Sequence, residues 1–184
     1  MSEPQELPAI SYDAETLRES FAAAADEVEA HRARLVGEIR DAPDETGELL
    51  ARGDLIDLLR ITGELDEALN EANAAVDRAE IAGTAAQQHL ARLRLARVQQ
   101  WRGQFVDSNP LYTELLAAAG QFGPVVEAFT HQHAGENDYD QEHWDDAREH
   151  FARALGVRER LELDDASLSR AALNAAERHR RASS

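Results

Sequence analysis

The feature that most constrains the fold is an internal repeat with a period near 40 residues. Three bulky residues that follow short turns stand 40 and 39 positions apart, namely Leu65, Phe105 and Trp144. Three positions after each of them comes a small residue, namely Ala68, Ser108 or Ala147. The bulky side chain would fill the turn between two helices, and the small one would let the second helix approach the first. Such self-similarity is typical of stacked helical hairpins, because one hairpin cannot bury its own apolar face.

Glycine and proline residues divide the chain into segments with helical periodicity. We expect helices at about 13–39, 46–62, 65–82, 85–102, 109–120, from 123 onward, at 143–156, and from about 164 to near the C-terminus. Asp13 would cap the first helix, and Asn109 with Pro110 would begin the fifth. No stretch alternates with a period of two residues for long enough to predict a strand. The sequence therefore predicts an all-α fold.

The repeat resembles the tetratricopeptide repeat, whose antiparallel helix pairs stack into a right-handed superhelix. The resemblance covers about 47–156 and implies three repeats, at about 47–83, 84–122 and 123–160, in a single domain of residues 13–182. An N-terminal helix (13–46) and a C-terminal helix (164–182) would cap the ends, and residues 1–12 would form a flexible leader. Repeat three matches best, because Gly135 stands where the family has a small residue.

The chain also departs from the family. Its period exceeds the usual 34 residues, the proline after the second helix is missing, and Ile56 and Ala96 stand at the places equivalent to Gly135. A non-repeating helical bundle is the alternative fold.

The first helix of each repeat would line a concave groove, so the resemblance places a ligand there. The candidate partner-binding residues are Asp57, Arg60, Leu93, Arg94, Arg97, Gln100, Trp101, Phe129, Gln132, His133 and Glu136. Arg94 and Arg97 lie one turn apart and could hold a carboxylate between them. They could instead pair with Asp54, Asp57 or Glu136 of neighbouring repeats, which is the interpretation that we favour. Chaperone-binding members of the family use Lys and Asn at places where this chain has neither.

Charge and composition exclude several classes of function. All 19 basic residues are Arg, against 36 acidic residues, and the formal charge is −17. Such a chain offers no basic stripe to nucleic acid. It has no Cys, no apolar run of membrane-spanning length and no signal peptide, so we expect a cytoplasmic protein without membrane contact. Because Arg is the only cation of the groove, an acidic or carboxylate-bearing partner is the specific expectation.

Metal binding and catalysis find little support in the sequence. His131, His133, His143 and His150 do not share a helix face in the way a metal site needs. The spacing of the acids from Asp138 to Glu149 imitates a calcium loop, but His143 stands where that loop needs glycine. No catalytic or cofactor motif is present, so we expect no enzyme activity, metal or cofactor. The expected function is a protein-interaction scaffold. The alternatives are a self-associating protein, dimeric through the groove or the N-terminal helix, and then a His/carboxylate metal protein.

Overall fold

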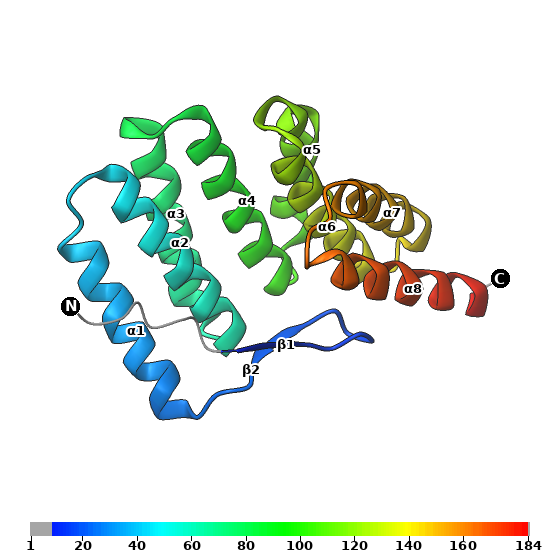
Figure 1. The fold of residues 1–184 in the computed structure, drawn as a ribbon, viewed down its shortest axis with the longest axis horizontal. Helices are drawn as coiled ribbons and strands as arrows, with labels where there is room; N and C mark the ends of the chain where they lie inside the picture. The colour runs from blue at the N-terminus through cyan, green and yellow to red at the C-terminus, as the bar shows by residue number, and fades with distance from the viewer. Residues whose placement is uncertain (1–8, 184) are drawn as a thin grey trace.

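The computed structural model describes residues 9–183 as an array of α-helices preceded by a short β-hairpin (Figure 1). The hairpin pairs β1 Ile10–Tyr12 with antiparallel β2 Glu19–Phe21. The helices are α1 Ala25–Arg40, α2 Glu45–Thr62, α3 Leu65–Ala82, α4 Ala85–Trp101, α5 Phe105–Ala118, α6 Pro124–Asp140, α7 Trp144–Arg160 and α8 Ala166–Ala182, with a 3₁₀ turn η1 Ala119–Phe122 after α5. Consecutive helices pack on one another, which confirms the expected all-α fold of stacked helix pairs.

Local signals set most of the helix ends. At the start of α2 the carboxylate of Asp44 accepts a hydrogen bond from the backbone N–H of Gly47 at 2.8 Å. At the start of α4, Thr84 and Gln87 cap each other's backbone N–H groups reciprocally. Helix α2 ends at Gly63, whose left-handed backbone conformation is a common helix terminator. These signals explain why the expected bounds of α2, α3 and α4 agree with the structure to within a residue.

The sequence repeat is also a structural repeat, formed by the pairs α2–α3, α4–α5 and α6–α7. The turn inside each pair has a residue with positive φ at the equivalent place: Gly63 at 86°, Gly103 at 69° and Glu142 at 61°. The small residues at the starts of the second helices, Ala68, Ser108 and Ala147, are all completely buried. Each pair is therefore closely packed at the place where the sequence pattern predicts it.

The apolar core continues from one helix pair to the next. One cluster joins α1, α2, α3 and α4, a second lies among α4, α5 and α6, and a third joins α6, α7 and α8. Each helix uses its apolar face for this stacking. Within residues 9–183, none of the helices combines the length and the apolar character that crossing a membrane requires.

The N-terminal part of the chain differs from the prediction. Helix α1 begins at Ala25 rather than at residue 13, and residues 10–21 form the hairpin. The Asp13 carboxylate accepts hydrogen bonds from the backbone N–H groups of Glu15 and Thr16, both at 2.8 Å, and so turns the chain instead of starting a helix. The expected flexible leader is partly wrong as well, because residues 10–12 form β1; residues 1–8 lie outside the described residues.

Two further helix bounds need correction. Helix α5 begins at Phe105, so Asn109 and Pro110 lie inside it rather than at its start. Ser108 and Tyr112 are buried on the side of α5 that packs on its neighbours, and this packing outweighs the hydrogen bond that Pro110 cannot donate. Helix α7 continues past residue 156 to Arg160.

Candidate functional site

The candidate residues named from the sequence all lie on α2, α4 and α6, the first helices of the three pairs. We call the surface that these helices share the inner face. The hairpin lies beside the array, near the ends of α2 and α4 and close to α8 (Figure 1), and its strand β2 contacts α2. The place expected for a partner is therefore covered in part by the chain's own N-terminal segment.

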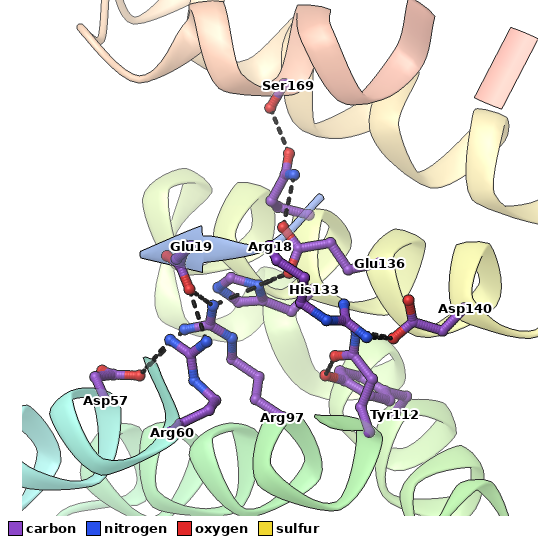
Figure 2. A network of polar contacts seen from close by, with 12 residues as sticks. Arg18, Glu19, Asp57, Arg60, Arg97, Tyr112, His133, Glu136, Asp140 and Ser169 are labelled. Atoms are coloured by element: carbon purple, nitrogen blue, oxygen red, sulfur yellow. Dashed lines mark hydrogen bonds and ion pairs between the residues drawn. The ribbon is translucent and has the colours of Figure 1, made fainter. Parts of the chain in front are cut away.

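The centre of the inner face is an ion cluster that includes a hairpin residue, Glu19 (Figure 2). The Glu19 carboxylate lies 2.7 Å from the Arg60 guanidinium and 2.9 Å from that of Arg97. The two arginine side chains are only 1% and 4% exposed. Arg60 lies on α2 and Arg97 on α4, so the two arginines belong to neighbouring helix pairs. We call them the clamp, because together they hold the one carboxylate of Glu19.

A second carboxylate completes the clamp from within the array. Asp57 lies 3.1 Å from Arg60, 3.2 Å from Arg97 and 3.3 Å from Arg94. Arg94 and Arg97 thus converge on an acid of the preceding repeat, which is the intramolecular pairing that we favoured from the sequence. Arg97 also pairs with Glu19, so one guanidinium binds an acid of the helical array and an acid of the hairpin.

The electrostatics of the cluster keep its acids ionised. Burial alone would raise the pKa of Asp57, but Arg60, Arg97 and Arg94 outweigh it and hold that pKa well below its usual range. Burial likewise opposes ionisation of Glu19, and Arg97 and Arg60 again bring its pKa below the ordinary value. Burial disfavours the charged form of Arg97 too, yet Glu19 and Asp57 raise its pKa. The clamp is thus a site for a carboxylate rather than for a carboxylic acid.

A chain of buried polar side chains leads from the clamp toward α8. Glu136 Oε2 lies 2.9 Å from His133 Nδ1, and its Oε1 accepts a hydrogen bond from the Gln132 amide at 3.0 Å. Ser169 donates to the Gln132 carbonyl at 2.7 Å, and Arg158 donates to Ser169 at 2.6 Å. Burial would raise the pKa of Glu136, but His133 and Arg97 lower it to about 2. These residues are held by one another, so the structure gives them a positioning role behind the clamp.

Trp101 lies between two guanidinium groups at the edge of the inner face. The Cζ atom of Arg60 is 4.6 Å from the ring centroid, and that of Arg18, from the hairpin, is 4.9 Å away. Arg18 also pairs with Asp140 at 2.8 Å, and Gln100 donates to the same carboxylate at 2.9 Å. The indole of Trp101, one of the candidate partner-binding residues, thus contacts the chain's own hairpin in a cation–π arrangement.

Two candidate residues differ in their surroundings from the rest. Leu93 is buried in the apolar cluster with Tyr112 and Leu115, so its side chain packs in the core between neighbouring helix pairs. Phe129 is 37% exposed and meets the ring of His133 edge-on, with centroids 4.4 Å apart. Phe129 therefore extends the inner face with an apolar surface next to the buried network.

None of the hairpin residues at the site was among the residues predicted from the sequence. Leu17, Arg18 and Glu19 all lie within the helix expected at about 13–39. The strands are three residues long, so the alternation in residues 10–12 and 19–21 is too short to distinguish from chance. The available signal was the turn chemistry of Asp13, which suits a turn as well as a helix cap.

The late histidines and acids do not gather around a single point. His131 Nδ1 lies 2.9 Å from His150 Nδ1, and His150 Nε2 lies 3.6 Å from Asp138. The acids with calcium-loop spacing are divided among α6, the turn that follows it and α7. Among the residues that the structure describes, no three His, Asp or Glu side chains are arranged to hold a metal ion.

Comparison with known proteins does not assign this chain to a family. No protein-family model matches the sequence, and no curated protein matches it significantly. The functional assignment therefore depends on the contacts of the inner face.

Proposed function

We propose that this chain is a non-catalytic, tetratricopeptide-like scaffold that binds an acidic segment of a partner protein on its inner face. The observation that carries the proposal is the seat of Glu19 between Arg60 and Arg97. Within the chain itself, a carboxylate from an extended segment is held by arginines of two successive helix pairs. A partner segment that brings a carboxylate to the same place would find the same contacts.

The chemistry of the clamp suits such a ligand. Guanidinium groups present several donors in a fixed plane and stay charged when buried, which makes them effective receptors for carboxylates. Hydrogen bonds that involve charged groups contribute about 1.5–3 kcal/mol each, roughly twice the value for neutral pairs. Arg60 is also stacked on Trp101, so its position is fixed before a ligand arrives. Fixed donors reduce the entropy that binding must overcome.

The fold supports the same function. Stacked helix pairs present side chains from several helices along one continuous surface, as repeat proteins do when they bind extended partners. The turn geometry and the buried small residues of the three pairs also support the tetratricopeptide-like assignment. Cytoplasmic location belongs to the same proposal, since a chain without Cys is suited to a reducing compartment.

Affinity capture with matched variants tests the proposal. The bait chains are the wild type, Arg97→Gln and a control, Arg153→Gln, whose arginine is exposed on α7, where it pairs with Glu127. Glutamine keeps a donor but removes the charge, and circular dichroism checks that each bait is folded. We expect the wild type and the control to retain the same proteins, and Arg97→Gln to lose those that bind the inner face. Identical sets of retained proteins for all three baits would refute the clamp as the binding site.

A further inference from the structure

The hairpin depends on the helical array for its order. Its two strands have three residues each, and isolated two-stranded hairpins of such length are at best marginally stable in water. It forms no strand pairing with any other segment of residues 9–183. Contacts of its side chains with the inner face therefore hold it in place, as they would hold a bound peptide.

Three consecutive residues of the hairpin contact three different parts of the array. Leu17 is 2% exposed and packs with Tyr139 and Phe151 in the cluster of α6, α7 and α8. Arg18 pairs with Asp140, and Glu19 lies between the two arginines of the clamp (Figure 2). The Arg18 guanidinium also lies over the Trp101 ring. The hairpin thus touches α2, α4 and α6 together, the same three helices that would hold a partner.

The docked conformation also carries strain. Leu17 has a φ of 55°, a left-handed conformation that is unfavourable for a residue with a branched side chain. Undocking would let Leu17 leave this conformation and so recover some of the free energy lost with the contacts. A partner segment that places a leucine and a glutamate at the same sites without this strain has an advantage over the hairpin.

We infer that residues 9–22 are an internal competitor for the inner face, displaced by a partner segment that carries a leucine followed two residues later by a glutamate. The inference depends on the proposed function, because it assigns the same face to both ligands. A tethered segment acts at a high effective concentration, and it lowers the apparent affinity of a competing ligand in proportion to the time it stays docked. Residues 22–24 tether the hairpin directly to the start of α1.

The first test measures release of the hairpin in the full chain. The open variant is Leu17→Ala with Glu19→Gln, which removes the buried side chain and the charge in the clamp. The matched control is Ser11→Ala with Ser20→Ala, at two exposed residues that face each other across the strands. Trypsin cleavage after Arg18, followed by mass spectrometry, should be at least tenfold faster in the open variant and unchanged in the control. Unchanged cleavage in a folded open variant would overturn the inference, because those contacts would not be holding the hairpin.

The second test measures competition with a synthetic peptide of residues 9–22. Fluorescence anisotropy should show at least tenfold tighter binding of the labelled peptide to the open variant than to the wild type or the serine control. A peptide with Leu17→Ala and Glu19→Gln should bind none of the chains. If the double variant does not fold, Glu19→Gln alone preserves the volume of the side chain and should show a smaller change in the same direction.

A measurement on the wild-type chain needs no substitution. A saturating amount of the peptide should accelerate trypsin cleavage of the chain after Arg18, and a scrambled peptide should not. Equal affinity for wild type and open variant would overturn internal competition and leave the proposed function standing. Absence of binding to an open variant whose hairpin is released would refute the inner face as a binding site, and the proposed function with it. The wild-type chain could also form a dimer in which Arg18 is protected from trypsin, and lose this protection when dilution dissociates the dimer. That result would show that the hairpin of a second copy occupies the inner face, and it would overturn the contact within one chain.

Discussion

Replacing glycine by alanine should have opposite effects on stability at Gly135, in α6, and at Gly156, in α7. The reason is the close contact between these two helices. A Cβ atom added at Gly135 would lie 2.6 Å from Cε1 and 2.7 Å from Cδ1 of Phe151. Phe151 is completely buried, and a close-packed core gives its ring no free space into which to move. Gly156 lies on the exposed side of α7, where an added Cβ would have nothing within 4 Å.

Two contributions to the free energy of unfolding decide the outcome, namely helix propensity and core packing. Alanine is favoured over glycine inside a helix by roughly 0.5–1 kcal/mol, and both variants gain this amount. Overpacking of a filled core costs about 1–3 kcal/mol, and only Gly135→Ala pays it. We therefore expect Gly156→Ala to be more stable than the wild type and Gly135→Ala to be less stable. The difference between the two variants isolates the packing cost, because the propensity gain cancels.

Thermal unfolding followed by circular dichroism measures the effect. For a chain of this size, about 1 kcal/mol corresponds to a shift of about 2–4 °C in Tm. Gly156→Ala should raise the Tm by a few degrees, and Gly135→Ala should fall below Gly156→Ala by roughly 2–12 °C. Equal Tm values for the two variants would refute the close approach of α6 and α7, and with it the role of the small residue in the third repeat.

Three other substitutions have defined outcomes. Glu142→Gly should raise the Tm by about 2–4 °C, because glycine removes the cost of the positive φ in the third turn; an unchanged Tm would contradict this. Burial, with help from Asp146, raises the pKa of Asp138 to about 6, so its ionisation destabilises the fold as the pH rises from about 4 to about 6. Asp138→Asn should therefore stabilise the chain in urea at pH 7 and not at pH 4, and equal effects at both would count against it. Despite burial, Arg97 and Arg60 lower the pKa of Glu19, so hairpin docking should be complete above a pH of about 4.3 and be lost as the pH falls through the depressed value. Trp101 fluorescence in a Trp144→Phe chain should report this transition, and Glu19→Gln should abolish it.

The helical array was predictable because its signals are local. Gly63 and the Thr84–Gln87 capping box mark helix ends within a few residues, and the equivalent spacing of Leu65, Phe105 and Trp144 sets the pairs. Where local rules conflicted, the repeat was the better guide: its alignment placed the start of α5 near Phe105, while Pro110 suggested a later start. Packing on neighbouring helices decides such conflicts, because losing one hydrogen bond costs less free energy than leaving a whole apolar helix face exposed.

The hairpin was not predictable from the sequence, and neither was the burial of the clamp beneath it. Residues 13–24 have helical spacing of apolar residues, and only contacts with distant helices make Leu17 more stable in the core than on a helix stripe. Alignment of the repeats placed Arg60 and Arg97 on the face that α2, α4 and α6 share, because helical periodicity sets which side chains lie on one surface. It could not show that both would be buried, since the residue that covers them, Glu19, lies 78 positions from Arg97.

The charges of the inner face explain why the ligand that we propose should be acidic, although the protein is itself acidic. Three arginines (60, 94 and 97) converge there on three carboxylates (19, 57 and 136), so the set balances only while a carboxylate occupies the place of Glu19. A segment without that carboxylate would cover two nearly buried guanidinium groups and leave them short of a partner, which is costly. The formal charge of −17 repels an acidic partner at long range, but this repulsion is screened by salt beyond about 10 Å, whereas the buried clamp is screened much less. Under the proposed function, partners would therefore be selected at contact distance. A partner would have to bind the inner face more tightly than the tethered hairpin, which needs no long-range approach.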